Sequence, residues 1–284
     1  MKGSDAMTRW KAFWCSLLIT LFCLLPLYLL TVGGQLFGAQ PVEESAGGVP
    51  VLSASPQDKL TLLLVLRDPA PAAVLLRLDA WEQRAQVLVL PADTLLPAQE
   101  GRITLQDCYE QAGPLQLRTA LEDVLGAPFE RYLCLFGDTL AETFGEYAPV
   151  MNWHELGSIR DLALLRRLAF NGGEGAIAGS TAAALVRQCE SPSAAAQLRA
   201  ALYRAFLTEG LPTLYGPAVE LLRSDEELLT DITAVDIYGV ERLLKLLAAA
   251  PPAVECSVPE GIVTADGWQL TDAGWQAMRD LLAD

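Results

Sequence analysis

The sequence has little histidine, little positive charge and no clustered cysteines. His154 is the single histidine among 284 residues, and no two of the six cysteines form a Cys-x-x-Cys pair. A zinc site or a Ser-His-Asp triad needs such side chains held together in sets. These absences oppose a zinc enzyme and a triad hydrolase, and we interpret His154 as a surface loop residue.

Positive charge is scarce relative to negative charge. The chain has 20 basic and 35 acidic residues, of which three and one lie in the first eleven, so 17 and 34 remain beyond them, a net charge of −17. A domain of that charge repels nucleic acid and anionic lipid. The composition therefore opposes DNA binding and, with it, a role as a transcription regulator.

One long apolar run lies near the amino terminus. The 21 residues Ala12–Val32 contain no charge, and a helix of that length spans roughly 32 Å, enough to cross a bilayer core. Lys2, Arg9 and Lys11 precede it, which keeps the amino terminus in the cytoplasm by the positive-inside rule. We therefore predict a cytoplasmic segment 1–11, a transmembrane anchor 12–32 and an extracytoplasmic remainder at the cell membrane. The alternative is a cleaved signal peptide, whose apolar core usually has about 7–15 residues.

The rest of the chain divides into a stalk and a domain. Residues 33–58 are rich in Gly, Pro, Ser and Glu without an apolar period, which is typical of a flexible stalk. Residues 59–284 alternate between strand and helix patterns. This alternation predicts an α/β domain with three α-β-α layers and a mixed central sheet.

The predicted elements of the domain follow from apolar period and from capping residues. The predicted strands are Leu60–Leu66, Ala73–Leu78, Gln86–Leu90, Tyr132–Phe136, Val254–Val258 and Trp268–Leu270. The predicted helices are Leu105–Gln111, Pro114–Leu125, Asp138–Gly145, Thr181–Glu190, Ala194–Thr208, Pro212–Ser224, a helix from Thr233 to about Ala249, and Asp272–Leu282 after a Thr271 cap. The stripe of Val240, Leu243, Leu244 and Leu247 is expected to be core.

Four stretches of the domain carry motifs whose order and spacing can be compared with those of known families. They are Val87–Thr94 ending in Pro-Ala-Asp-Thr, Leu105–Leu125 with Tyr109 and Gly113-Pro114, Gly179–Arg187 ending in Ala-Leu-Val-Arg, and the closing hairpin and helix Gly267–Leu282. In order and spacing they resemble the extracytoplasmic domain of the LytR-CpsA-Psr family, over nearly all of Leu60–Leu282.

The resemblance implies an outward-facing, single-pass protein that transfers anionic glycopolymers from a polyprenyl pyrophosphate carrier to peptidoglycan. Family members hold the pyrophosphate with arginines and with a magnesium ion on aspartates, and hold the lipid in an apolar tunnel between sheet and helices. At matching positions, the resemblance implies Asp93, Arg187 and Arg199 as ligand-binding residues. The alternative interpretation is a polar strand end for Asp93 and helix-surface arginines paired with acids for the other two.

Most of the positions at which the family has charged or amide side chains carry small or apolar residues in this chain. They are Pro71, Ala92, Cys189, Ser193, Ala196 and Ala200. Each lost charge-assisted hydrogen bond to a buried phosphate costs about 1.5–3 kcal/mol. The sequence thus predicts a retained fold, an apolar pocket with at most two arginines at its mouth, and a largely dismantled anion site. It assigns no catalytic residue and no metal ligand, and Mg²⁺ is the expected cofactor only if activity remains.

The sequence leaves two functions open. The first is a degenerate family member that acts as a binding or scaffold protein in cell-wall polymer assembly, with a polyprenyl lipid in its pocket and cell-wall assembly proteins as partners. The alternative is an active, divergent phosphotransferase with the family's substrates. Whether the chain is an enzyme is therefore left open, and nucleic acid is not expected as a partner.

Overall fold

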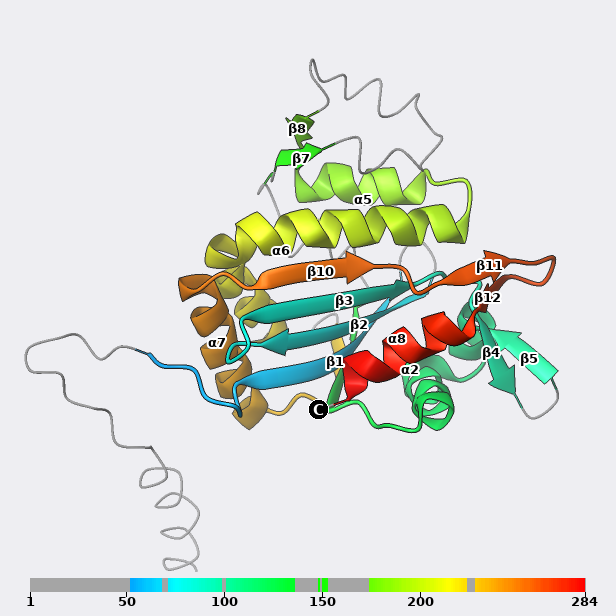
Figure 1. Ribbon diagram of the computed structural model, residues 1–284, viewed down its shortest axis with the longest axis horizontal. Helices are drawn as coiled ribbons and strands as arrows, with labels where there is room; N and C mark the ends of the chain where they lie inside the picture. Colours follow the sequence, from blue (N-terminus) through cyan, green and yellow to red (C-terminus); the bar gives the residue numbers. More distant parts are fainter. Residues whose placement is uncertain are drawn as a thin grey trace, which may run out of the picture. The chain divides into compact units, whose positions relative to one another are not determined.

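A six-stranded mixed sheet forms the centre of the domain (Figure 1). The computed structural model describes residues 52–67, 71–98, 101–135, 148, 150–152, 174–223 and 228–283, and Ser53–Asp284 form one compact unit. The sheet order is β10-β3-β2-β1-β6-β9. The strands are β1 (Lys59–Leu66), β2 (Ala72–Asp79), β3 (Arg84–Leu90), β6 (Arg131–Leu135), β9 (Leu228–Thr230) and β10 (Ala253–Ser257).

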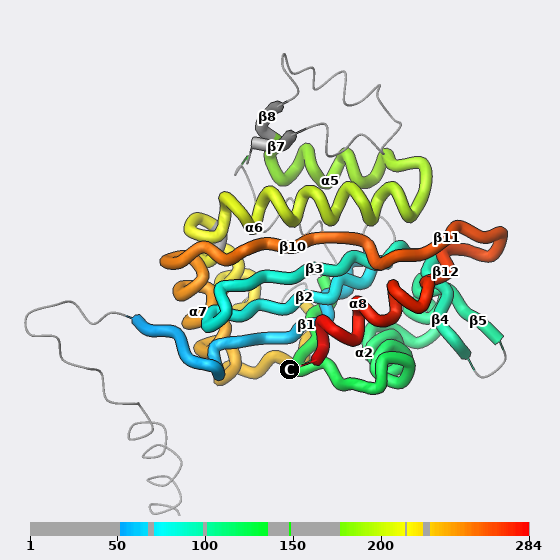
Figure 2. The backbone as a smooth tube through the Cα atoms, in the orientation of Figure 1, coloured from blue at the N-terminus to red at the C-terminus, as the bar shows by residue number. Residues whose placement is uncertain are grey.

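Four of these strands run in the same direction. β1 is parallel to β6 and β10 is parallel to β3, while β2 pairs antiparallel with both β1 and β3. Figure 2 traces this path from the start of the described chain through the β1–β2–β3 meander. The carboxyl ends of β1, β3, β6 and β10 therefore share one edge of the sheet, which we call the carboxyl edge; the opposite edge is the amino edge.

The central strands are buried on both faces. In β1, Leu62, Leu64 and Leu66 pack into one core cluster, while Leu63 and Val65 pack into another on the opposite face. A strand with successive apolar residues can satisfy two helical layers because its side chains alternate between faces. The predicted strands at Leu60–Leu66, Ala73–Leu78 and Gln86–Leu90 are confirmed within two residues at each end.

The first helical layer consists of α2 (Leu105–Leu125) and α8 (Asp272–Leu282). The α2 helix begins after Thr104, whose hydroxyl accepts the Asp107 N–H, and it is interrupted at Gly113, where φ is +77°. Only glycine adopts this conformation without strain, so the two predicted helices on either side of Gly113 are correct. Thr271 caps α8 as predicted, accepting the Gly274 N–H at 3.2 Å.

The second layer consists of α5 (Gly179–Arg187), α6 (Pro192–Arg223) and α7 (Ala234–Ala249). Val240, Leu243, Leu244 and Leu247 of α7 are buried, as predicted. The prediction of separate helices at Ala194–Thr208 and Pro212–Ser224 is wrong, because α6 continues through Pro212 and Pro217. Proline usually ends or kinks a helix, but buried residues on both sides of Pro212, such as Phe206 and Val219, keep α6 on the core.

Three short hairpins were missed or only partly predicted. They are β4 (Leu95–Ala98) with β5 (Gly101–Thr104), β7 (Val150–Asn152) with β8 (Glu174–Ala176), and β11 (Gly261–Val263) with β12 (Trp268–Leu270). Only Trp268–Leu270 was expected. Strands of three or four residues are too short to show an alternating pattern.

Several predictions fall on residues that the structure does not describe. They are the anchor 12–32, most of the stalk, Phe136, the helix Asp138–Gly145 and His154. Among the described residues, no helix has the length and apolar character needed to cross a bilayer.

The end of the predicted stalk belongs to the domain. The segment Ser53–Asp58, which we call the lead-in segment, is fixed against α7 and the β2–β3 turn. Arg242 donates to the Ser53 carbonyl oxygen at 2.8 Å and to Asp58 Oδ1 at 2.7 Å, and Ala80 N–H donates to the Asp58 carbonyl oxygen at 2.9 Å. The prediction of a free stalk up to residue 58 therefore extends too far, because composition does not reveal contacts made by backbone groups.

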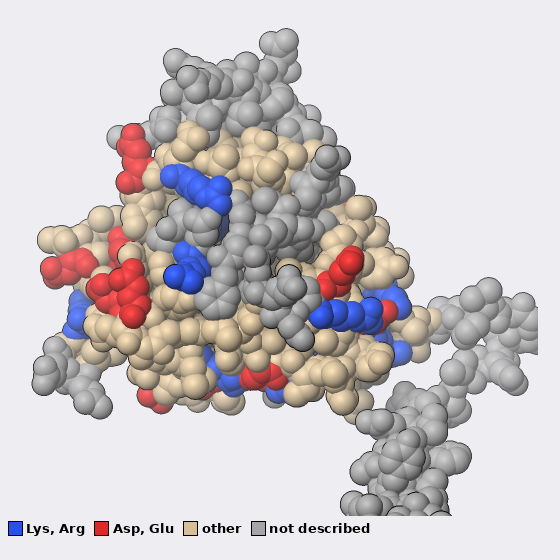
Figure 3. All heavy atoms as spheres, turned by 180° about the vertical axis from the view of Figure 1, so that it is seen from behind, with Lys and Arg blue, Asp and Glu red and all other residues tan. Residues whose placement is uncertain are grey.

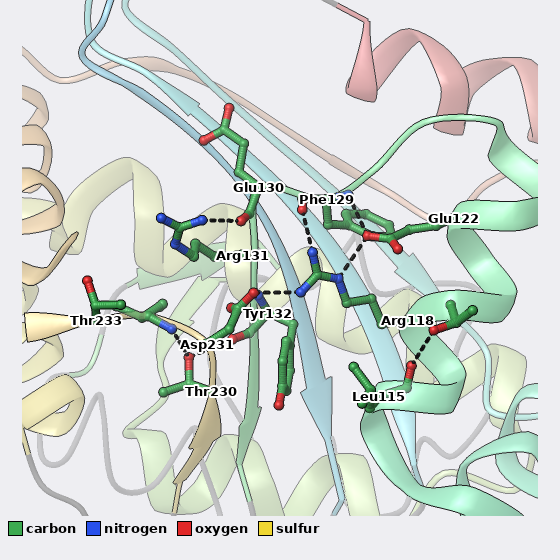
Figure 4. A network of polar contacts seen from close by, with 12 residues as sticks. Leu115, Arg118, Glu122, Phe129, Glu130, Arg131, Tyr132, Thr230, Asp231 and Thr233 are labelled. Carbon is green, nitrogen blue, oxygen red and sulfur yellow. Dashed lines mark hydrogen bonds and ion pairs between the residues drawn. The ribbon is translucent and has the colours of Figure 1, made fainter.

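A polar network fixes α2 against the start of β6 and the end of β9 (Figure 4). Arg118 donates to Glu122 at 2.8 Å, to Asp231 at 2.5 Å and to the Phe129 carbonyl oxygen at 2.8 Å. Asp231 also accepts the Tyr132 N–H at 2.7 Å. Charged groups that share several hydrogen bonds couple elements more firmly than a surface ion pair does.

A carboxylate at the amino terminus of α7 makes the stability of the fold depend on pH. Arg131 binds the Asp236 carboxylate with two hydrogen bonds, and Thr233 N–H and Oγ also donate to it, so the pKa of Asp236 is held well below its usual range. The carboxylate therefore stabilises the fold above its unfolded pKa of about 3.9, and this contribution is lost as pH falls through the lower folded value.

We expect Asp236→Asn to lower the free energy of unfolding at pH 7 by about 1 kcal/mol, because the side chain is partly exposed and the charge is screened. The difference from the wild type should shrink steadily below pH 4. Urea unfolding at several pH values measures it, with Asp123→Asn on the exposed surface of α2 as the control. A difference that grows on acidification would contradict this assignment.

Candidate functional site

An apolar cavity lies between the sheet and the second helical layer. Its volume is about 170 Å³, similar to a cavity that holds a benzene-sized molecule. Residues of β1, β2, β3 and β6 form one wall, and residues of α6 and α7 form the other. Among those that line it are Leu62, Leu64, Leu133, Tyr203, Ala218 and Leu244. No lining residue is charged, so an apolar pocket is present where the sequence predicted one.

The carboxyl edge brings a cation and a phenol together. Arg67 follows β1 directly, and its N–H donates to the Leu135 carbonyl oxygen at 3.2 Å. The Tyr109 hydroxyl of α2 lies 3.8 Å from the Cys134 sulfur. Burial raises the pKa of Tyr109 to about 12, which the contact with Cys134 reinforces and the charge of Arg67 opposes. Tyr109 is therefore a neutral hydrogen-bonding group at physiological pH.

Cys134 is not positioned to act as a nucleophile. Its side chain is fully buried, and burial raises the pKa of its thiol against the opposing effects of Tyr109 and Arg67. A thiol attacks only as the thiolate. The Cys189 sulfur, just beyond the end of α5, donates to the Leu185 carbonyl oxygen at 3.6 Å.

Asp93 lies just beyond β3 and is held by its backbone. The Trp268 N–H donates to its carbonyl oxygen at 2.9 Å. Gly267, with φ at +138°, is so close that an added Cβ would lie 2.3 Å from the same oxygen. Asp93 Oδ1 is buried and accepts no hydrogen bond from the described residues. Burial consequently raises the pKa of the Asp93 carboxyl.

The two predicted arginines differ in their surroundings. Arg187 is exposed at the last turn of α5, whereas Arg199 on α6 is only 4 % exposed. The α5–α6 connection lies at the end of the molecule towards which β3 and β10 run (Figure 1). The alternative of a surface position therefore fits Arg187 but is wrong for Arg199, since a guanidinium is rarely so buried unless it is paired or bound.

The three predicted residues come from opposite layers. Asp93 contacts β12, beside α8, while Arg187 and Arg199 belong to the helices over the other face. Ala92, Ala196 and Ala200, which the resemblance aligns with charged or amide side chains of the family, are at most 5 % exposed. This chain has buried methyl groups at these positions.

The described residues around Asp93 do not fit a magnesium site. Mg²⁺ is held by several oxygen ligands, usually carboxylates. Within the part of the chain that the structure describes, no three His, Cys, Asp or Glu side chains come close enough to hold a metal ion. Asp93 supplies one carboxylate, and the resemblance aligns Pro71 with the family's second.

The sequence missed two parts of this site. No role was predicted for Arg67, and Tyr109 was indicated only as part of a motif. The parallel direction of β1 and β6, which places Arg67 beside Leu135, would have been the signal. On the face shown in Figure 3, basic side chains lie in separate groups among acidic ones, not in one basic patch.

Comparison with known proteins relates the chain to solved structures only. No family model matches it, and no curated protein sequence matches it. B. subtilis TagT superposes with a TM-score of 0.57 at 17% identity, over 86% of this chain and 96% of TagT. A structure of TagT bound to LIIa-WTA gives 0.58 at 15% identity, over 86% and 97% of the two chains.

B. subtilis TagV gives a similar result, with a TM-score of 0.56 at 12% identity over 80% of this chain and 97% of TagV. TagT and TagV are LytR-CpsA-Psr proteins. The resemblance seen in the sequence is thus confirmed for the fold, which this chain shares over nearly the full length of those structures.

Proposed function

We propose that this chain is a membrane-anchored envelope protein that binds a polyprenyl-type lipid, with part of the lipid chain in its apolar cavity, and supports cell-wall polymer assembly without transferring polymer itself. The supporting observation is the contrast between the cavity and its surroundings. The cavity between the sheet and α6–α7 is lined by uncharged residues. Ala92, Ala196 and Ala200 fill interior positions that the resemblance aligns with charged or amide groups of the family.

The scarcity of cations opposes catalysis. Transfer from a pyrophosphate needs stabilisation of the charge that develops on the leaving group, and positioned cations or a metal ion usually provide it. Arg67, Arg187, Arg199 and Arg204 are basic residues towards the carboxyl edge, and Arg204 already donates to the Cys256 carbonyl oxygen at 2.6 Å. No carboxylate cluster for Mg²⁺ occurs among the described residues. We expect apolar contacts to supply the energy of lipid binding. We expect the few cations to give little stabilisation of a transition state.

The test uses the full chain in detergent micelles. We expect it to bind polyprenyl phosphate equally with Mg²⁺ and with a chelator, and to leave a polyprenyl pyrophosphate-linked sugar intact under conditions in which TagT turns it over. Arg187→Ala should bind as the wild type does, because Arg187 is exposed. Mg²⁺-dependent turnover that disappears in Arg187→Ala would overturn the proposal.

A second candidate function is the divergent phosphotransferase. The burial of Arg199 favours it, because an interior guanidinium is suited to hold a desolvated phosphate. Arg67 and the neutral Tyr109 hydroxyl at the carboxyl edge could add a cation and a donor. Turnover by the wild type that Arg199→Gln abolishes, with unchanged unfolding behaviour, would support this candidate over the first.

A further inference from the structure

One end of the domain carries a group of exposed apolar residues. The connection from α7 to β10 is Ala-Ala-Ala-Pro-Pro-Ala over residues 248–253, and Ala249, Pro251 and Ala253 are exposed. Trp81, at the tip of the β2–β3 turn, is 59% exposed. We call these four residues the apolar pole.

Hydrogen bonds bring these segments together at the amino edge. The Ala253 N–H donates to the Gln83 carbonyl oxygen at 2.8 Å, and the Ala80 N–H donates to the Asp58 carbonyl oxygen at 2.9 Å. The β2–β3 turn that carries Trp81 is thus held by β10 on one side and by the lead-in segment on the other. Figure 1 shows the lead-in segment, α7 and the start of β10 at the same end of the molecule.

The turn holds Trp81 outward on a rigid support. Asp79 is 5% exposed, and its Oδ1 accepts the Glu82 N–H at 2.8 Å, which closes the turn. Gln83 adopts a φ of +52° to complete it. A tryptophan on a fixed turn tip cannot fold back on the core, so its indole surface remains available to a partner.

The charges around the apolar pole are largely paired. Arg242 binds Asp58, and Arg84 binds Glu255 at 3.0 Å. Glu82, next to Trp81, is the exposed charge closest to it in sequence. Such a surface is unusual on a chain with a net charge of −15, and it suits a partner that is neither basic nor strongly acidic.

We infer that the apolar pole rests on the surface of a lipid bilayer, with Trp81 in the headgroup region. The chain that precedes the domain supports this partner, because the charge-free run Ala12–Val32 lies upstream of the lead-in segment, which is fixed at this same end of the domain. Tryptophan is enriched at membrane interfaces, where its ring is amphipathic. The inference rests on the membrane anchor of the proposed function, but not on its lipid cavity.

The experiment places the full chain in phosphatidylcholine vesicles and uses Trp81→Phe and Trp275→Phe. Subtracting each variant's fluorescence from the wild type isolates Trp81 or Trp275, which is half-buried on α8. With brominated lipid, we expect the Trp81 component to be quenched at least two-fold more than the Trp275 component. In vesicles, aqueous iodide should quench the Trp81 component less than expected for a side chain that is 59% exposed to water.

Three results would overturn the inference. Failure of the chain to float with the vesicles would remove the anchor and the inference together. Flotation with a Trp81 component that iodide quenches and bromine does not would remove only the inference, and lipid binding in detergent would still test the cavity. Protection of Trp81 in native membranes, but not in pure lipid vesicles, would assign the pole to a protein partner.

Discussion

Replacing Ala218 with phenylalanine is expected to abolish binding of polyprenyl phosphate. Ala218 lies on α6 and its side chain lines the apolar cavity, whose volume of about 170 Å³ is close to that needed by a benzene-sized molecule. The added ring would therefore occupy the space that we assign to the lipid. We expect at least a ten-fold rise in Kd for polyprenyl phosphate, measured with the full chain in micelles.

The same substitution should leave the fold intact. A ring that fills an apolar cavity replaces missing contacts instead of displacing packed groups, so the free energy of unfolding should change by less than about 1.5 kcal/mol. Ala273→Phe on the exposed surface of α8 is the matched control and should bind lipid as the wild type does. Full binding by Ala218→Phe would show that the ligand, if any, lies elsewhere.

Replacing Asp231 with alanine is expected to destabilise the fold more than Asp236→Asn does. Asp231 joins Arg118 of α2 to the Tyr132 N–H of β6, and its side chain is 31% exposed. Two hydrogen bonds, one of them charge-assisted, disappear, and Arg118 keeps only Glu122 and the Phe129 carbonyl oxygen (Figure 4). We expect the free energy of unfolding to fall by about 2–4 kcal/mol.

A thermal scan of the full chain should show this as a fall in Tm of roughly 5–12 °C for a domain of this size. Asp231→Asn keeps an oxygen that can accept the Tyr132 N–H but removes the negative charge beside Arg118. Its effect should lie about midway between those of the wild type and Asp231→Ala. If Asp231→Ala stayed within about 0.5 kcal/mol of the wild type, the network would not be what fixes α2 to the sheet.

The interior of the fold could be predicted from the sequence, because the patterns that indicate its strands and helices lie within short segments. The Leu60–Leu66 run, the glycine that breaks α2 and the Thr233 and Thr271 caps each depend on a few adjacent residues. The continuation of α6 through Pro212 could not be predicted from the sequence, because it depends on the burial of α6 against other elements. The β4–β5 hairpin was missed for a different reason, because strands of four residues are too short to show an alternating pattern.

The candidate site was predicted only in part. Motif resemblance pointed to Asp93, Arg187 and Arg199, but it could not tell that Arg199 is buried and Arg187 exposed. Exposure depends on which face of a helix meets the sheet, and two arginines on successive helices look alike in sequence. The place of Arg67 beside Leu135 depends on strand direction, which a motif does not encode.

For a chain held in a bilayer by the predicted anchor, the contacts that fix the lead-in segment would limit the distance between the domain and the membrane. With Ser53–Asp58 fixed to α7 and the β2–β3 turn, only the 20 residues Gly33–Leu52 separate the domain from the predicted anchor. A chain of that length reaches at most roughly 70 Å, and a flexible one has a typical span of about 25 Å. That span is comparable to the radius of gyration expected for a domain of this length, about 17 Å. Lipids in the same leaflet would thus meet the domain at a high local concentration, so even weak contacts at Trp81 or the cavity could be occupied much of the time.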